Sequence, residues 1–360
     1  MTAALPRYAV ERLTGFTQAL LERAGVQPDD AATSAEILVT ADVYGIESHG
    51  IARLGYYMGL IGGELIDLKA TPVIERQTAV TATVDARNGF GPPSAHWAMT
   101  TCLDKAEAAG LAMVTVRNSN HFGIAGYYAM MAASRGLVGM AMTNAGAQVV
   151  PAHGRQPMFG TNPLAVAVPA GRERPFLLDM ATSAVSWGKI EIKRREKAPM
   201  PLGWALDADG EPTTDPEAAD LLLPLGSDGE RGAHKGYGLV TLVDILCGPL
   251  AGAAFGPLVA GMRTRPPRAS GIGHFFAAWR PDAFRPLEEF RADMDALIAG
   301  LHESAPAPGH ERVRVAGEPE FAAEQDRRAH GVPVHAAVVA ELEALGAQMG
   351  VPFPPPGTER

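Results

Sequence analysis

The chain has 360 residues, which is more than most single domains hold, so we expect about two domains. Hydrophobic residues make up 47% and charged residues 20%, which is ordinary globular usage. The net charge of -9 argues against nucleic acid as the main partner, because phosphate binding requires a basic surface.

The cysteine content and the first residues both favour a cytoplasmic protein. Cys102 and Cys247 are the two cysteines, and neither has the spacing of a disulfide framework or a metal site. Residues 1–13 contain no apolar segment of the kind that a signal peptide needs. We therefore predict a reducing, cytoplasmic location.

The first 70 residues are predicted to be helical, with a break at Ser48 to Gly50 and helical spacing from Ile51 onward. An alternation of strands and helices follows. Strands are expected at 80–84, 111–116 and 137–142, and helices at 93–109 and 124–134. The run from 111 to 142 is typical of a strand–helix–strand unit, so we expect its two strands to pair in parallel.

Further buried strands are expected at 164–168, 176–178 and 274–279, and amphipathic helices at 286–303 and 334–349. The polar, Pro-rich segment 193–228 is predicted to be an excursion over the surface. The apolar stretch from Gly236 to Met262 is long enough for a membrane span, but its glycines and prolines favour a buried helix followed by a Gly-rich turn.

The first motif that could carry chemistry is the run Glu47-Ser48-His49-Gly50-Ile51-Ala52-Arg53. A helix would place His49 and Arg53 on one face, because they are four residues apart. Arginine can hold a carboxylate with two hydrogen bonds, and histidine can transfer a proton near neutral pH. A 2-hydroxy or 2-oxo acid needs both groups. The alternative is a helix N-cap at Ser48 followed by two ordinary surface residues.

His121 lies in the loop Asn118 to Gly123, which joins a predicted strand to a predicted helix. Ligands in α/β folds bind at the carboxyl ends of strands, so this histidine is a functional candidate. The alternative is a turn in which Gly123 supplies a positive φ.

Three further loops also follow or precede buried strands, and each could instead be an ordinary turn. Small residues in two of them would let a flat ring or a phosphate approach closely. The third opens an apolar helix with a lysine between glycines, which suits a phosphate. These loops are Gly160 to Pro163, Asp179 to Ser183 with its continuation to Lys189, and Gly232 to Gly238.

Several common signatures are missing from the sequence. It contains no GxGxxG, no GxxxxGK[ST], no HExxH and no GxSxG. The histidines at 49, 121, 153 and 234 do not have a recognised zinc spacing. We therefore predict an enzyme without a metal site and without a Rossmann fingerprint.

Taken together and in this order, the motifs resemble the malate/L-lactate dehydrogenase family, which also includes ureidoglycolate, sulfolactate and diketogulonate enzymes. The resemblance runs from about Ala41 to about Phe284. It rests on the segments ESHGIARLGYY, VRNSNHFGIAGYYA, MFGTNPLAVAVPA, LDMATSAVSWGKI, HKGYGL and GIGHFFAAWRPDAF.

The resemblance implies an α/β fold of three layers, α/β/α, around a mixed sheet, with a non-Rossmann domain for NAD or NADP at 76–285. Residues 1–75 together with 286–360 would form a helical domain for substrate binding and dimerisation. The implied partners are a small 2-oxo or 2-hydroxy acid and a second copy of the chain, without nucleic acid or membrane.

The resemblance also implies roles for individual residues. His49 would be the proton donor or acceptor, oriented by Ser48, although some relatives use the residue at His121 instead. Arg53 would hold the substrate carboxylate and Thr161 would contact the substrate. The implied cofactor contacts are His121, Phe122, Gly123, Asn144, Asp179, Met180, Ala181, Thr182, Ser183, Lys235, Gly236, Gly317 and Glu318.

Two positions depart from the family pattern. Ala145 stands where the family usually has serine, which puts one cofactor hydrogen bond in doubt. Lys189 stands where cyclic-imine reductases carry an acidic residue, which favours hydroxy and oxo acids. A reductase of cyclic imine 2-carboxylates and a non-catalytic nucleotide-binding homologue remain the alternatives.

Overall fold

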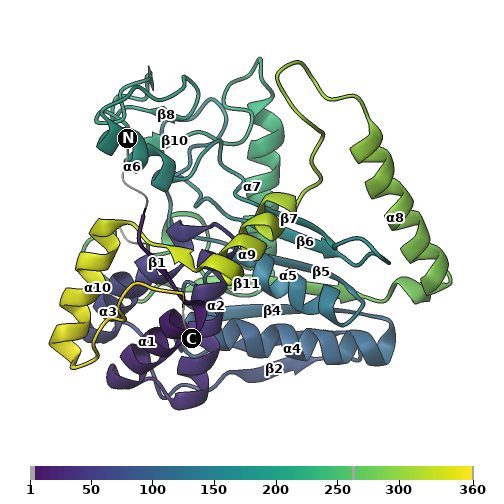
Figure 1. Ribbon diagram of the computed structural model, residues 1–360, viewed down its shortest axis with the longest axis horizontal. Coiled ribbons are helices and arrows are strands. Elements are labelled where there is room, and N and C mark those ends of the chain that lie inside the picture. Colours follow the sequence, from purple (N-terminus) through teal and green to yellow (C-terminus); the bar gives the residue numbers. More distant parts are fainter. Residues whose placement is uncertain (1–4, 262–263, 359–360) are drawn as a thin grey trace.

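The computed structural model describes residues 5–261 and 264–358. Its centre is a seven-stranded mixed sheet with the strand order β2-β3-β4-β11-β5-β6-β7 (Figure 1). Only the pair β3 and β4 is parallel, and every other neighbouring pair in this sheet is antiparallel. The strands are β2 Val73–Gln77, β3 Thr81–Asp85, β4 Leu111–Ser119, β5 Val138–Thr143, β6 Leu164–Val168, β7 Phe176–Met180 and β11 Ile272–Trp279.

The predicted parallel pairing of strands 111–116 and 137–142 is wrong. β4 and β5 do point the same way, but β11 lies between them and pairs antiparallel with both. Every residue of β11 except Trp279 is buried, so this strand from late in the chain fills the centre of the sheet. The parallel unit is instead β3, helix α4 (Gly91–Ala109) and β4.

Helices cover both faces of the sheet, as the predicted three-layer α/β/α fold requires (Figure 1). Helix α4 and helix α5 (Ala125–Ser134) pack on one face over a core rich in alanine. Gly139 of β5 permits this approach, because a Cβ there would lie 2.4 Å from the Cβ of Ala132. Helix α7 (Ala233–Cys247) covers the other face, with Val243 packed in the same cluster as Phe275.

A separate apolar core joins the two ends of the chain. It is formed by α1 (Val10–Arg23), α2 (Pro28–Val43), α3 (Leu54–Gly62) and α10 (Ala336–Met349). Strand β1 (Arg7–Tyr8) pairs with β12 (Val332–Pro333) beside it. Helix α8 (Leu287–Glu303) lies at the opposite side of the molecule in Figure 1, and α9 (Glu318–His330) lies between. The division into domains at 75 and 286 stays a prediction.

The segment 193–228 is more ordered than a surface excursion suggests. It contains the end of α6 (Trp187–Glu196) and a small sheet of β8 (Ala205–Leu206), β9 (Pro212–Thr213) and β10 (Leu221–Leu222). This part has its own apolar cluster, which includes Ile190, Met200 and Leu222.

The apolar stretch after Gly236 forms a helix followed by turns, as predicted, since α7 ends at Cys247. The helix is buried on one face only, because Leu242 and Ile245 are each 47% exposed. Met262 lies outside the described residues. Among the described residues, no helix combines the length and apolar character that crossing a membrane requires. Single 3-10 turns complete the fold at η1 Glu47–His49, η2 Ile51–Arg53, η3 Gly256–Leu258 and η4 Pro281–Ala283.

Candidate active site

The segment that carries His49 and Arg53 is not the single helix that the spacing predicts. It forms two 3-10 turns, η1 and η2, which are separated by Gly50 at φ -90° and ψ -146°, and α3 begins only at Leu54. The Arg53 Nε nevertheless folds back and donates to the carbonyl oxygen of Ser48 at 2.5 Å. The turns therefore hold the guanidinium close to His49 without helical geometry.

His49 is prepared as a neutral imidazole. The Ser48 hydroxyl lies 2.9 Å from His49 Nδ1, so Ser48 fixes the orientation of the ring. Burial and, to a smaller extent, the nearby charge of Arg53 together lower the pKa of His49 to about 4. Because Nδ1 is engaged with Ser48, Nε2 is the atom left for proton exchange with a ligand.

His121 follows β4, as the sequence predicts, and it stacks beside His49 with the ring centroids 5.5 Å apart. Its Nδ1 lies 2.7 Å from the Tyr57 hydroxyl and also accepts the Gly123 N–H at 3.4 Å. Since a backbone amide can only donate, Nδ1 is the acceptor and the neutral ring carries its hydrogen on Nε2. Burial, then the charges of His49 and Arg53, hold the pKa of His121 well below its usual range.

Tyr57 is a site residue that the sequence interpretation missed. It is fully buried, packs edge-on against Phe90 and directs its hydroxyl at His121. The sequence analysis gave only helical spacing for the segment from Ile51 onward, and such a pattern does not distinguish a packed ring from one that orients a histidine.

His274 on β11 was also missed, although it lies within an otherwise apolar strand. Its two ring nitrogens lie 2.8 Å from the hydroxyls of Thr143 and Ser119, so it links β5, β11 and β4. Burial lowers the pKa of His274 to about 3. The ring stacks on Phe122 at 4.6 Å, which makes Phe122 a buried packing residue beneath the His121 loop.

A second group of predicted contacts lies just after the ends of β5 and β7, and its polar side chains bind the protein backbone. Asn144 donates to the Ala254 carbonyl and accepts the Gly273 N–H. Thr182 donates to the carbonyl oxygens of Thr161 and Asn162, and Ser183 to that of Val185. Asn144, Thr182 and Ser183 are therefore buried structural residues, and Thr161 contributes its carbonyl oxygen to the same network.

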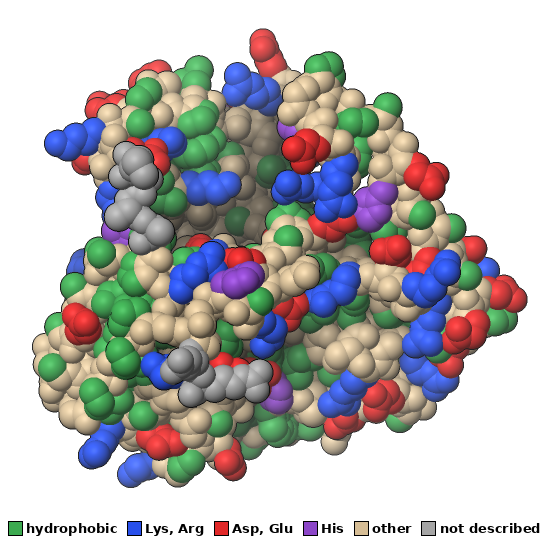
Figure 2. Space-filling view, viewed as in Figure 1, with side chains coloured by type: hydrophobic (Ala, Val, Ile, Leu, Met, Phe, Trp, Pro, Cys, Tyr) green, Lys and Arg blue, Asp and Glu red, His purple; other side chains and the backbone are tan. Residues whose placement is uncertain are grey.

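The start of α7 reaches this second group through Leu225, whose N–H donates to Thr182. Gly236 packs so closely on Leu225 that a Cβ would lie 2.0 Å from its carbonyl oxygen. Close packing therefore accounts for Gly236, whereas Lys235 is exposed beside Gly232, which has φ +90°. Figure 2 shows the surface hollowed between the lobe with α6 and β8 and the region of α7, with Lys and Arg side chains at the rim.

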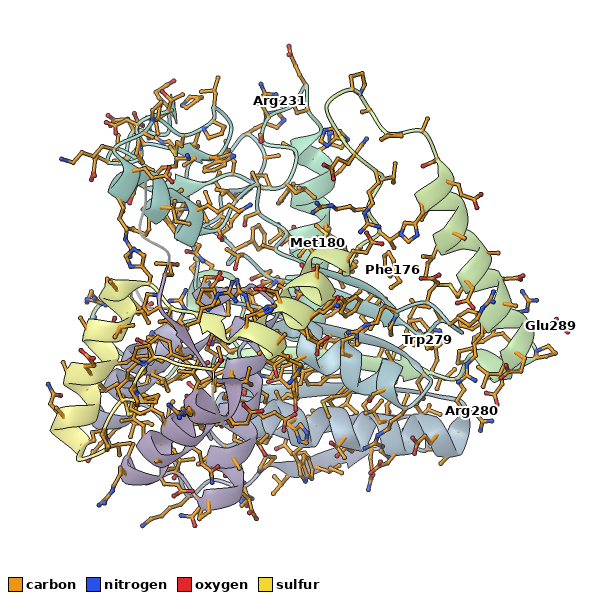
Figure 3. All side chains as sticks on the ribbon, in the orientation of Figure 1. Phe176, Met180, Arg231, Trp279, Arg280 and Glu289 are labelled. Carbon is orange, nitrogen blue, oxygen red and sulfur yellow. The ribbon has the colours of Figure 1, made fainter. Side chains whose placement is uncertain are left out.

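Asp179 lies in β7, one residue before its end, and holds the start of α5, because one of its carboxylate oxygens accepts the Gly126 N–H at 2.8 Å. Burial raises the pKa of Asp179 to about 6. Figure 3 places Met180 towards the centre of the molecule and Phe176 nearer the periphery, and Ala181, which follows Met180, is partly exposed. The turn that carries Ser48 and His49 is close to the start of α6, since a Cβ on Gly188 would lie 3.5 Å from that of Ser48.

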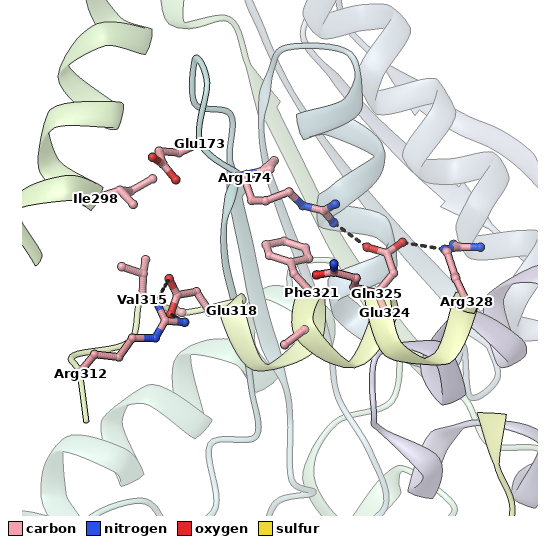
Figure 4. A pocket seen from close by; sticks show the side chains of 13 residues that line it. Glu173, Arg174, Ile298, Arg312, Val315, Glu318, Phe321, Glu324, Gln325 and Arg328 are labelled. Atoms are coloured by element: carbon pink, nitrogen blue, oxygen red, sulfur yellow. Dashed lines mark hydrogen bonds and ion pairs between the residues drawn. The ribbon is translucent and has the colours of Figure 1, made fainter. Parts of the chain in front are cut away.

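Gly317 and Glu318 lie beside β7, since a Cβ on Gly317 would be 2.9 Å from the Cβ of Leu177. Gly317 has φ +97° and precedes α9, while Glu318 pairs with Arg312 at 3.1 Å and with His302. Glu318 lines a cavity of about 480 Å³ together with Arg174, which lies over the ring of Phe321 (Figure 4). None of the residues that line this cavity comes from the turn 47–57 or the loop 118–123.

Comparison with known proteins finds the same family over nearly the whole chain. Residues 8–343 match the model of the malate/L-lactate dehydrogenase family. The malate dehydrogenase of Pyrococcus abyssi is 40% identical over 96% of this chain and 95% of its own length.

Two solved structures share the fold. That of malate dehydrogenase from Pyrococcus horikoshii has a TM-score of 0.90 and 37% identity, with 97% of each chain covered. That of delta1-piperideine-2-carboxylate reductase from Pseudomonas syringae has a TM-score of 0.83 and 31% identity, covering 94% of this chain and 99% of that one. The chain belongs to the malate/L-lactate dehydrogenase family and is an NAD(P)-dependent oxidoreductase of small 2-hydroxy acids.

Proposed function

We propose that the substrate is malate or a close analogue, bound with its 2-carboxylate on Arg53 and its 2-oxygen against the paired histidines. The observation that carries this proposal is a guanidinium held beside two buried, stacked imidazoles. An anion in such a site needs a cation, because burying it alone would be costly. The greater similarity to malate dehydrogenases than to the imine reductase, together with Lys189, favours hydroxy and oxo acids over cyclic imines.

In this proposal His49 exchanges the proton of the substrate hydroxyl through Nε2, and Ser48 holds the ring. His121 donates a hydrogen bond from its own Nε2, because Tyr57 and Gly123 occupy its Nδ1. The substrate carboxylate would neutralise Arg53 and so remove one of the causes that depress the pKa of His49.

NAD or NADP would accept or supply the hydride when it is bound. The residues fit a dinucleotide, because Lys235 is exposed at the start of α7, where an anionic phosphate is favoured. No described carboxylate pairs with Lys235, so its charge is available to such a group. We propose that Asn144, Thr182, Ser183 and Asp179 shape the cofactor site through the backbone they hold.

We further propose a cytoplasmic homodimer whose physiological acid is malate or lactate. Both cysteines are free and buried, which agrees with a reducing compartment. The dimer is supported by large apolar side chains that are about half exposed on α7 and the turns after it, namely Leu242, Ile245, Leu250, Phe255 and Leu258.

The proposal is tested by supplying NADH or NADPH with a panel of acids and following absorbance at the nicotinamide band. The panel contains oxaloacetate, pyruvate, sulfopyruvate and a cyclic imine 2-carboxylate. We expect oxaloacetate to give the highest kcat/KM. Faster turnover of the imine would reassign the reaction, and cofactor binding without turnover of any acid would favour a non-catalytic homologue.

A further inference from the structure

The carboxylate of Asp42 lies directly beneath the turn that separates His49 from Arg53. Asp42 is near the end of α2 and is 3% exposed. Its Oδ2 accepts the N–H of Ile51 at 2.7 Å. Gly50 lies so close that a Cβ would be 2.2 Å from both carboxylate oxygens. The backbone of Gly50 and Ile51 is thus seated on this single side chain.

Arg327 of helix α9 also binds the segment between Asp42 and Glu47. Arg327 donates to the carbonyl oxygen of Asp42 and, at 2.5 Å, to the carboxylate of Glu47. Asp42 and Glu47 flank the loop that leads into η1, so both ends of this loop are tied to one guanidinium. The Asp42 carboxylate itself forms no ion pair among the residues 5–261 and 264–358.

A carboxyl group buried in this position is costly to the fold. The pKa of Asp42 is raised to about 8, chiefly by burial and less by the charge of Glu47, while the Ile51 N–H and the charge of Arg327 act in the opposite direction. An apolar side chain of similar size would avoid the cost of desolvation. What the carboxylate supplies is an acceptor for one amide, and that amide belongs to the residue between the two proposed catalytic side chains.

We propose that Asp42 is a positioning residue that sets the placement of His49 relative to Arg53 by holding the amide of Ile51. The proposal rests on the function proposed above for those two residues. Because Gly50 separates the two 3-10 turns, no continuous helical hydrogen bonding fixes the placement of His49 relative to Arg53. The hydrogen bond from Ile51 to Asp42 fixes it instead. Its effect falls on the 2-oxo acid rather than on the cofactor.

The test compares Asp42→Ala with Asp42→Asn. The alanine variant loses the acceptor, whereas asparagine keeps an oxygen that can accept the Ile51 N–H. A displacement of about 1 Å in a catalytic group can lower the rate about 100-fold. We expect Asp42→Ala to lower kcat/KM for the best 2-oxo acid about 10–100-fold, with both a lower kcat and a higher KM, while the Kd of NAD(P)H stays within about twofold. Asparagine should restore most of the loss.

Asp295 of α8 provides the matched control, because it accepts the backbone amides of Gly171, Arg172 and Glu173. Asp295→Ala should lower the Tm and leave kcat/KM unchanged. If Asp42→Ala does not fold, Gly50→Ala disturbs the same contact from the other side and should show the same kinetic loss.

Asp42→Ala or Gly50→Ala with normal kcat/KM would overturn the proposal, as would an equal loss in Asp42→Asn. Absence of turnover by the wild-type enzyme with every 2-oxo acid would instead refute the proposed function itself. The wild-type measurement therefore separates the two failures.

Discussion

Two groups of polar residues were predicted to carry the function, and the structure uses them differently. Around His49 and His121, hydroxyls and amides engage one nitrogen of each ring and leave the other for a ligand. Around Asn144 and Thr182, the side chains are consumed by backbone carbonyls and amides. The first group therefore offers side-chain chemistry, whereas the second offers a backbone surface of fixed shape.

This difference shows that the type of a residue does not by itself indicate whether its side chain contacts a ligand. Asn, Thr and Ser in a loop after a strand suggest a ligand contact, but the same groups satisfy the buried backbone of tightly packed loops. A substitution in the first group should change the kinetics without unfolding the protein. One in the second group should change stability before it changes kinetics.

The largest effect is expected for His49→Ala. Removing a general acid or base typically lowers kcat by about 10²–10⁴-fold, and the Kd of NAD(P)H should stay unchanged because the ring is proposed to touch the acid. Steady-state kinetics and fluorescence titration measure the two quantities. A near-normal kcat would instead assign the proton-exchange role to His121.

Next in size is Arg53. Lysine keeps the charge but loses the planar fork, so Arg53→Lys should lose much of kcat/KM, and Arg53→Ala more. A charge-assisted hydrogen bond contributes about 1.5–3 kcal/mol, which corresponds to about 10–100-fold in rate. Weaker cofactor binding with an unchanged KM for the acid would instead assign Arg53 to the dinucleotide.

A smaller kinetic effect is expected for Lys235, the exposed lysine near the second group. Lys235→Ala should raise the KM for NAD(P)H about tenfold, because one charge-assisted contact to a phosphate is lost. The KM for the 2-oxo acid serves as the internal control and should change little. Equal KM values for the dinucleotide in both proteins would leave Lys235 as part of an ordinary helix start.

The smallest kinetic effect is expected for Thr182→Val, which has nearly the same shape. It removes the hydroxyl that bonds to Thr161 and Asn162, so unfolding should become easier by about 1–3 kcal/mol. Denaturant unfolding measures this change, and kcat/KM should stay within about twofold of wild type. A large kinetic loss in a stable variant would make Thr182 a direct ligand contact and remove the distinction between the two groups.

The sequence was sufficient for contacts between neighbours in the chain. Strand β4, its following loop and His121 were all predicted, because local periodicity and loop position report on them. The insertion of β11 between β4 and β5 was not predicted, since that pairing joins residues more than 120 positions apart in the sequence. Asp42 and Tyr57 were missed for a related reason: their roles depend on Ile51 and His121, and each looks like an ordinary helix residue in its own segment.

The pH dependence of kcat/KM for oxidation of the best 2-hydroxy acid tests the central claim most directly, namely that the proton acceptor is a buried, neutral histidine. The acceptor must be unprotonated, and burial beside Arg53 lowers the pKa of His49 to about 4. The value of kcat/KM should therefore persist as the pH falls through 6.5 and decline only near pH 4. The enzyme should be shown to stay folded at each pH of the series. A decline centred near pH 6.5 or above would contradict the account, because it would identify the acceptor as a solvated group outside this site.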